Sequence, residues 1–96
     1  MKLLKIVPSH IPAKKFDAIF ETDEGKTKTV PFGSAPHQDY TQHKDKARRE
    51  RYRQRHVKDL KTNDPTRAGY LSYYILWGDS VNIKKNIETY KTRFGL

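Results

Sequence analysis

The chain has 96 residues, a formal net charge of +9 and no cysteine. This length allows one small basic domain, which we assign to residues 1–96, and the lack of cysteine excludes disulfides and thiolate metal sites. With 34% apolar and 32% charged residues the core must be small, and the positive charge favours anionic partners such as nucleic acid, lipid or acidic protein surfaces.

The first third of the chain has the alternation that is typical of β-strands. Apolar side chains recur at every second position in residues 16–20, and β-branched side chains follow in residues 26–32, after a turn-like Thr-Asp-Glu-Gly at residues 22–25. We predict a β-hairpin, with residues 3–7 as a candidate third strand and Pro31 at the end or the edge of its strand. The apolar run near the start is too short for a signal peptide or a membrane span.

Helix signals begin after a predicted loop at residues 33–43. Asp45 suits an N-cap, and residues 46 to about 60 contain neither glycine nor proline, which predicts the first helix. Asp64-Pro65 combines an N-cap residue with a proline in the first helical position, and Gly78 is a stop signal, so a second helix is predicted between them.

The last helix is predicted from an apolar stripe. Ser80 suits an N-cap, and four apolar positions follow at steps of four, three and four residues, which places them on one helix face. These positions are Ile83, Ile87, Tyr90 and Phe94. The sequence therefore predicts an α+β fold, in which an N-terminal β-hairpin, three-stranded if residues 3–7 join it, precedes three short helices.

Most of the positive charge lies in the first predicted helix. Residues 44–61 contain nine Lys or Arg and three acidic residues. The arginines follow at steps that spread guanidinium groups over much of the helix circumference, and arginine pairs bidentately with carboxylates and phosphates alike. A solvated helix face, with arginine stems covering the core, is the alternative interpretation. The residues predicted to bind an anionic partner are Lys44, Lys46, Arg48, Arg49, Arg51, Arg53, Arg55 and Lys58.

The second predicted helix is apolar almost all round, which indicates burial on more than one side. Its aromatic residues are Tyr70, Tyr73, Tyr74 and Trp77. The ordinary interpretation is a central core helix. The alternative is an aromatic face that continues into a partner, because tyrosine and tryptophan are enriched at interfaces.

No pattern indicates a catalytic or cofactor site. The four histidines show no i, i+3 or i, i+4 pair, and the serines lack a glycine-rich context, so we expect no metal, no catalytic residue, no cofactor and no small-molecule substrate. Zinc-finger and RNA-recognition patterns are absent, so any nucleic-acid binding would involve phosphates without strong sequence preference. The histidines are His10, His37, His43 and His56.

A series of short motifs runs along residues 14–94. In chain order they are Phe32-Gly33, Tyr40-Thr41, His43-Lys44-Asp45, Arg51-Tyr52, Asp64-Pro65-Thr66-Arg67-Ala68-Gly69, Leu76-Trp77 and Arg93-Phe94. The series resembles a small, basic, uncharacterised protein family of nucleocytoplasmic large DNA viruses, the giant viruses of algae and amoebae. Tyr70, Tyr73 and Tyr74 depart from that family's pattern, in which Phe or Trp and a basic residue are expected. The resemblance implies a viral setting and supplies no catalytic residues.

The resemblance and the basic helix together lead to three functional hypotheses. The first is a non-enzymatic structural virion protein, made in the host cytoplasm, which acts as a minor capsid component and binds acidic surfaces of other capsid proteins through the Arg-rich helix. The second is a sequence-independent DNA- or RNA-binding virion protein. The third is an adaptor that binds an acidic host protein. None of the three needs a transmembrane segment.

Overall fold

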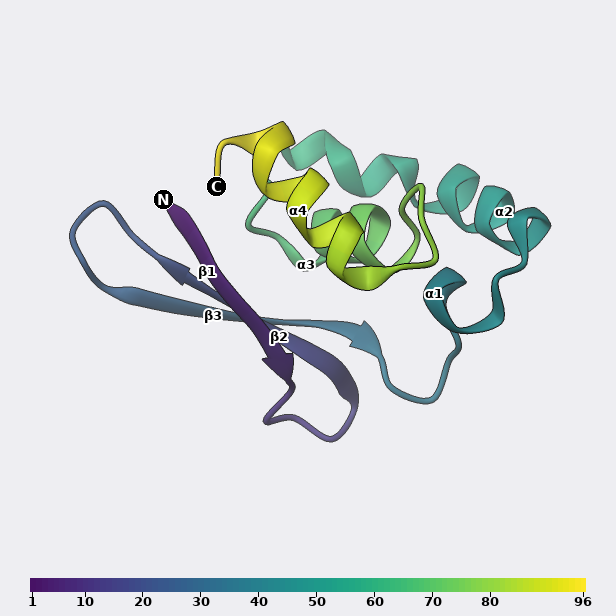
Figure 1. The fold of residues 1–96 in the computed structure, drawn as a ribbon, viewed down its shortest axis with the longest axis horizontal. Coiled ribbons are helices and arrows are strands. Elements are labelled where there is room, and N and C mark those ends of the chain that lie inside the picture. The colour runs from purple at the N-terminus through teal and green to yellow at the C-terminus, as the bar shows by residue number, and fades with distance from the viewer.

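The computed structural model describes the whole chain, Met1–Leu96, as a three-stranded antiparallel sheet with short helices on one face (Figure 1). The strands are adjacent in chain order: β1 (Lys2–Pro8), β2 (Lys14–Glu21) and β3 (Thr27–Ser34). The predicted α+β class is confirmed, and residues 3–7 do form part of a third strand.

The hairpin between β2 and β3 follows the predicted turn. Thr22 and Lys26 close it through a backbone hydrogen bond of 2.7 Å, and Gly25 has φ +81°, a conformation that glycine adopts without strain. Pro31 lies inside β3, opposite Asp17 of β2. A proline is tolerated there because β3 is an edge strand of the sheet.

The helical part is more broken than predicted. A short helix interrupts the predicted loop, a 3₁₀ helix replaces the end of the first predicted helix, and the second predicted helix starts late and ends as a π-helix. The helical elements are α1 (Tyr40–His43), α2 (Lys46–His56), the 3₁₀ helix η1 (Val57–Thr62), α3 (Ala68–Leu71), the π-helical segment η2 (Ser72–Leu76) and α4 (Ile83–Phe94).

One predicted helix start is confirmed and two are wrong. Asp45 caps α2, because its carboxylate accepts from the backbone N–H groups of Ala47 and Arg48. Asp64 instead accepts from the backbone N–H and hydroxyl of Thr66, which forms a turn and delays α3 to residue 68. The cap of α4 is Asn82, two residues after the predicted Ser80.

The core lies between the sheet and the segment from α3 to α4. Its central side chains come from both layers and are at most 2% exposed, and burying each stabilises the fold by roughly 1.5 to 3 kcal/mol. They are Leu3, Phe20, Phe32, Leu71, Ile75, Leu76 and Tyr90. The predicted stripe of α4 faces this cluster, since Ile83, Ile87 and Phe94 pack against it around Tyr90.

Two tyrosine hydroxyls attach α3 and α4 to the preceding segment, one at η1 and one at the turn after it. The hydroxyl of Tyr70 donates to the carbonyl of Leu60 at 2.6 Å, and that of Tyr90 donates to the carbonyl of Pro65. Burial raises the pKa of Tyr90 well above its usual value. Each buried phenol therefore has a backbone acceptor, which removes the cost of an unpaired donor.

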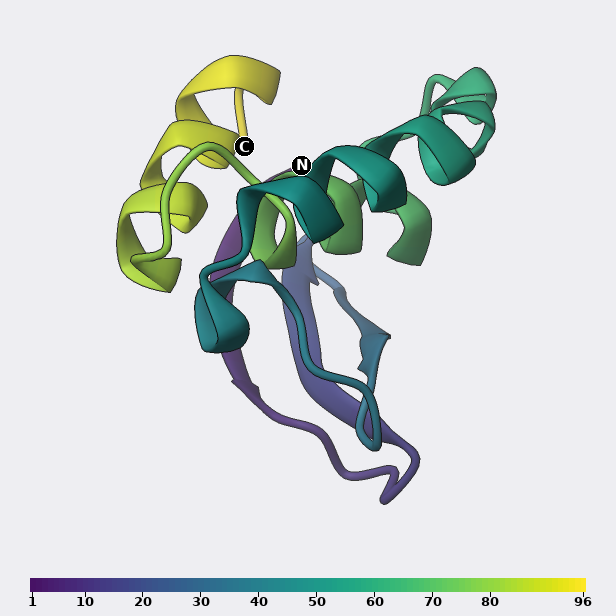
Figure 2. The ribbon, with the colours of Figure 1, turned by 90° about the vertical axis from the view of Figure 1, so that its right-hand side faces the viewer.

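Figure 2 shows α4 at the left of the green segment formed by α3 and η2, and α2 above that segment. Both helices therefore flank the same central element, and each can reach the turn at residues 77–80 that follows η2. No helix of the chain is both long and apolar enough to cross a membrane.

Candidate anion-binding surface

Helix α2 is attached to the domain by half-buried polar and aromatic side chains. None of its residues is fully buried, and its half-buried side chains lie at positions i, i+3, i+4 and i+7, which is one face of an α-helix. They are Arg49, Tyr52, Arg53 and His56. The helix therefore has a docked face and an exposed face, although its sequence is strongly charged throughout.

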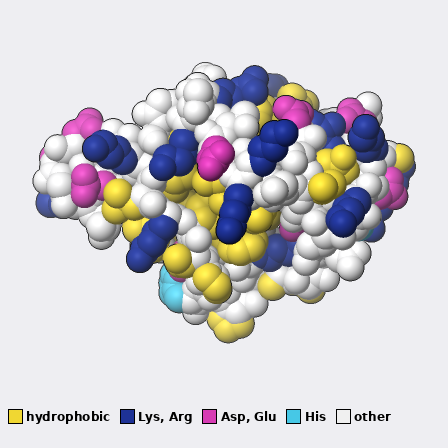
Figure 3. Space-filling view, in the orientation of Figure 1, with side chains coloured by type: hydrophobic (Ala, Val, Ile, Leu, Met, Phe, Trp, Pro, Cys, Tyr) yellow, Lys and Arg dark blue, Asp and Glu magenta, His cyan; other side chains and the backbone are white.

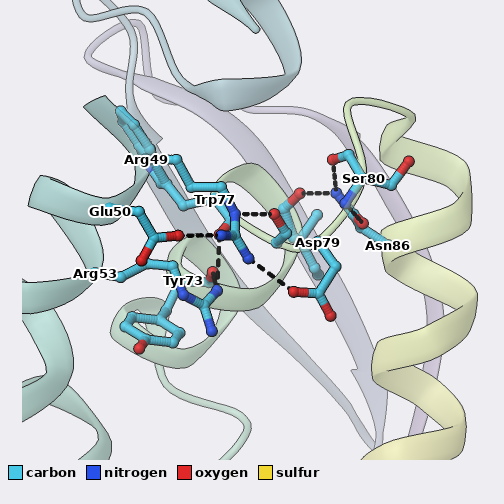
Figure 4. Close-up of polar contacts among 10 residues, drawn as sticks. Arg49, Glu50, Arg53, Tyr73, Trp77, Asp79, Ser80 and Asn86 are labelled. Carbon is cyan, nitrogen blue, oxygen red and sulfur yellow. Dashed lines mark hydrogen bonds and ion pairs between the residues drawn. The ribbon is translucent and has the colours of Figure 1, made fainter. Parts of the chain in front are cut away.

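Arg49 is occupied within the chain. Its Nε atom donates to the carbonyl of Gly78 at 2.6 Å, and its two terminal nitrogens pair with Glu50 and with Asp79, the latter at 2.7 Å (Figure 4). Its side chain is only 14% exposed. The prediction that Arg49 binds a partner therefore needs correction, because its donors hold α2 to the turn after η2.

Arg53, four residues after Arg49 on α2, contacts the same segment after η2. Its Nη1 atom donates to the carbonyls of Trp77 and Tyr73, at 2.8 and 3.3 Å, and its guanidinium lies 4.1 Å from the ring centroid of Tyr73. The last carbonyls of a helix have no partner inside the helix, so a cation is favourable there. Arg53 and Arg49 thus cap the carboxyl end of η2 from outside.

The aromatic side chains continue this contact as a row of rings, in which Trp77, Tyr52 and His56 are stacked and His43 is tilted against Trp77. The rings of His43, Trp77, Tyr52 and His56 follow one another with centroid separations of 5.2, 4.2 and 4.1 Å. Burial raises the pKa of Tyr52 to about 12. Trp77 therefore lies between α1 and α2 and joins both to the end of η2.

The other predicted aromatic residues pack inside the domain. Tyr70 and Tyr73 are 7% exposed, and Tyr74 packs against Tyr90 and Phe94. The structure places all of them, with Trp77, in or against the core. The interpretation as a central core helix accounts for them without a partner.

The remaining predicted cations are exposed and lie more than 4 Å from every carboxylate of the chain. Four of them, Arg48, Arg51, Arg55 and Lys58, follow at steps of three, four and three residues, which places them along one side of α2 and η1. We call these four residues the basic stripe. Lys44 and Lys46 lie beside its amino-terminal end.

Asp45, the cap of α2, lies close to the amino-terminal end of the stripe. Hydrogen bonds from the backbone N–H groups of Arg48 and Ala47 outweigh the effect of burial and lower the pKa of Asp45, and the charge of Arg51 adds to this. The carboxylate of Asp45 therefore accepts hydrogen bonds from the amino terminus of α2.

The histidines lie in separate places. His10 pairs with the buried Asp17, His56 lies 2.9 Å from Asp59, and His43 accepts at Nδ1 from the backbone N–H of Asp45. Burial lowers the pKa of His43, and its Nε2 atom has no partner. No group of three or more His, Asp or Glu side chains is arranged to hold a metal ion.

Lysine and arginine side chains also lie outside α2. Figure 3 shows the face that carries α4, where separate Lys and Arg side chains surround an apolar area. A small cleft lies at the carboxyl end of η2, lined by Arg53 of α2 and by Lys85, Thr89 and Arg93 of α4. Of these four residues, only Arg53 was predicted from the sequence as a binding residue. The other three follow one another at steps of four residues, and this spacing indicates that they share one face of a helix.

A protein-family model described as "Family of unknown function (DUF5754)" matches residues 4–56 of the chain. The matched region contains most of β1, all of β2 and β3, α1 and α2, and so includes Arg48, Arg51 and Arg55 of the basic stripe. No curated protein and no solved structure matches the chain.

Proposed function

The chain belongs to DUF5754, a family of unknown function, and we propose that it is a non-enzymatic binding protein that docks on an anionic macromolecular surface. The observation that carries this proposal is the basic stripe: four exposed cations along one side of α2 and η1, with α2 held in place by Arg49 and Arg53. Positive charge that served only to keep the protein soluble would not need to be aligned along one side of α2 and η1.

A fixed helix is a favourable way to present charge. The stripe is about 15 Å long, and because the helix is already ordered, binding costs only side-chain freedom. Arginine is the preferred cation at such sites, since its planar donors match carboxylate and phosphate oxygens and it is weakly hydrated. A stripe of this kind favours a defined surface over diffuse attraction.

The partner that we propose is an acidic surface of a capsid protein. The protein would then be a minor capsid component of the virion of a large DNA virus, made in the host cytoplasm. This part of the proposal is supported by the motif series from Phe32-Gly33 to Arg93-Phe94, together with the ability of arginine to pair with carboxylates.

A second candidate is sequence-independent binding to DNA or RNA. It is favoured by the spacing of the four exposed cations along one side of α2 and η1, because a phosphate backbone presents a row of closely spaced negative charges. Under this candidate the same cations would contact phosphates, and the affinity would fall steeply with salt.

The test of the first candidate is quantitative proteomics and lysine cross-linking on purified virions. We expect the chain at a copy number comparable to other minor capsid components, with cross-links from Lys46 or Lys58 to an acidic segment of a capsid protein. Absence from the virion, or presence in traces only, would contradict the proposal.

The second candidate is tested by fluorescence anisotropy with duplex and single-stranded DNA over a range of salt. The stripe variant carries Arg48→Gln, Arg51→Gln and Arg55→Gln, and the control carries the same loss of charge at the exposed Lys5, Lys14 and Lys26. Nucleic-acid binding predicts that the log–log salt slope shrinks by about two to three in the stripe variant and by less in the control. Equal losses in the two variants would mean general charge attraction and would exclude this candidate.

A further inference from the structure

The cleft at the carboxyl end of η2 lies on the side of α2 away from the basic stripe. Its volume is about 110 Å³, well below the roughly 300 Å³ or more of pockets for drug-sized ligands, yet enough for a small ion with a few waters. The lining residues come from α2, the end of η2, the following turn and α4. Those that carry the argument are Arg53, Asp79, Ser80, Lys85, Thr89 and Arg93.

Three cations from two helices meet in this cleft. Arg53 enters from α2, whereas Lys85 and Arg93 enter from α4, and none of the three pairs with a carboxylate of the chain. The single carboxylate in the lining, Asp79, pairs with Arg49 at 2.7 Å. The lining therefore has an excess of positive charge that nothing within the protein neutralises.

Two of these cations are already held in position. Arg53 uses only Nη1 for the carbonyls of Tyr73 and Trp77, which leaves Nε and Nη2 without an acceptor in the chain (Figure 4). The guanidinium of Arg93 lies 5.0 Å from the ring centroid of Tyr74, a cation–π contact. Both groups can therefore donate to a ligand without first leaving an intramolecular ion pair.

The spacing along α4 provides further donors. Lys85, Thr89 and Arg93 follow at steps of four residues, so they share one face and each step is about 6 Å along the helix axis. An ion held beside the Thr89 hydroxyl would lie within reach of the long side chains on both sides.

We propose that this cleft binds a phosphate-type oxyanion, supplied either as inorganic phosphate or as the phosphoryl group of a small phosphomonoester. A tetrahedral oxyanion has acceptors in several directions, which matches donors that come from two helices. The site uses α4 and the inner face of α2, so it goes beyond the proposed function and does not depend on the basic stripe.

The experiment is calorimetric and NMR titration of the full chain with inorganic phosphate and with glycerol phosphate, against chloride at equal ionic strength. We expect saturable binding, with amide shifts at Ser80 and along residues 85–93. Lys85→Gln and Arg93→Gln should each weaken phosphate binding about tenfold, because each removes a charge-assisted hydrogen bond. The matched control is Lys84→Gln, an exposed α4 residue outside the cleft, which should change the affinity less than about twofold.

The outcomes separate this site from the stripe. Retained phosphate binding in the Arg48→Gln, Arg51→Gln, Arg55→Gln variant would support the proposal, and comparing the two phosphate compounds would identify the source of the phosphoryl group. Shifts confined to the stripe, an equal loss with Lys84→Gln, or no saturable binding in a protein with native circular dichroism would overturn it.

Discussion

Trp77 lies flat against Tyr52, with ring centroids 4.2 Å apart and ring planes 5° from parallel. This stack joins the end of η2 to the middle of α2, a helix with no fully buried residue. The attachment of the whole basic helix therefore depends on a few side chains around these two rings, and the first three predictions concern them.

Tyr52→Ala should lower the free energy of unfolding by about 2 to 3 kcal/mol, because it removes a stacked and largely buried ring. Urea unfolding followed by circular dichroism measures this. The neighbouring exposed residue gives the control, since Arg51→Ala should change stability by no more than about 0.5 kcal/mol. Equal effects of the two substitutions would mean that the stack does not hold α2.

The hydroxyl of Tyr52 should make the free energy of unfolding depend on pH in the alkaline range. The pKa of Tyr52 is raised from 10.0 to about 12, so the folded state favours the protonated phenol. Its contribution to stability is complete below pH 10 and is lost as the pH rises from 10 to 12. The unfolding free energy of Tyr52→Phe should therefore fall less steeply over this interval than that of the natural protein. Parallel curves would contradict the prediction.

Arg53→Met should cost about 2 kcal/mol of stability, because two carbonyls at the end of η2 lose a charged donor. Arg55→Met, on the exposed face of the same helix, should change stability by about 0.5 kcal/mol or less. Chemical unfolding of both variants makes the comparison. A similar effect of the two substitutions would show that the arginines of α2 are equivalent, contrary to the structure.

Gly78→Ala should be more damaging than an ordinary glycine substitution. A Cβ atom at this position would lie 2.1 Å from the carbonyl oxygen of Tyr74 and 3.0 Å from Cγ of Asn86, so the turn or α4 must shift, at a cost of about 3 kcal/mol or more. Gly95→Ala is the control, because nothing lies within 4 Å there and only its φ of +64° costs about 1 kcal/mol. Thermal unfolding that ranked Gly95→Ala as the worse variant would refute this.

The stability of the fold should decrease at acidic pH because of Asp17. Burial favours the neutral carboxyl, but hydrogen bonds from His10 and Ser9 outweigh it and lower the pKa of Asp17 below 3.8. The resulting stability is present above the unfolded pKa and is lost as the pH falls through the folded value. NMR titration should find a higher pKa of Asp17 in the variant His10→Ala, with Asp23 as an internal reference. An unchanged Asp17 pKa would mean that the pair with His10 is unimportant.

The sheet and the last helix could be predicted because their apolar residues repeat at a regular period. Alternation in residues 16–20 predicted β2, and the stripe around Tyr90 predicted α4. The short helix α1 was missed, although Asp39 and Gln42 form a capping box whose spacing is visible in the sequence. The start of α3 was misplaced because an Asp-Pro pair caps a turn as readily as a helix.

The division of arginines between two faces of α2 was harder to predict. Arg49 and Arg51 have the same charge, so a count of charges cannot distinguish them. The difference is that Arg49 shares a face of α2 with Tyr52 and His56, which dock on the domain, whereas Arg51 is exposed. The π-helical turns of η2 carry no sequence signal of this kind. They depend on packing against Gly78 and Asn86, which lie later in the chain.

The core has a consequence for the order in which the protein can fold as it is synthesised. The apolar face of the sheet, with Phe20 and Phe32, is covered by Leu71, Ile75 and Tyr90, which follow it in the chain and are synthesised after it. The sheet is therefore synthesised before the side chains that cover it, and its apolar face stays open to water until α4 has been made. Residues 44–58, with eight Lys or Arg and two acidic residues, come before those covering side chains in the chain, so this positive charge, which favours solubility, is present while the sheet is still uncovered.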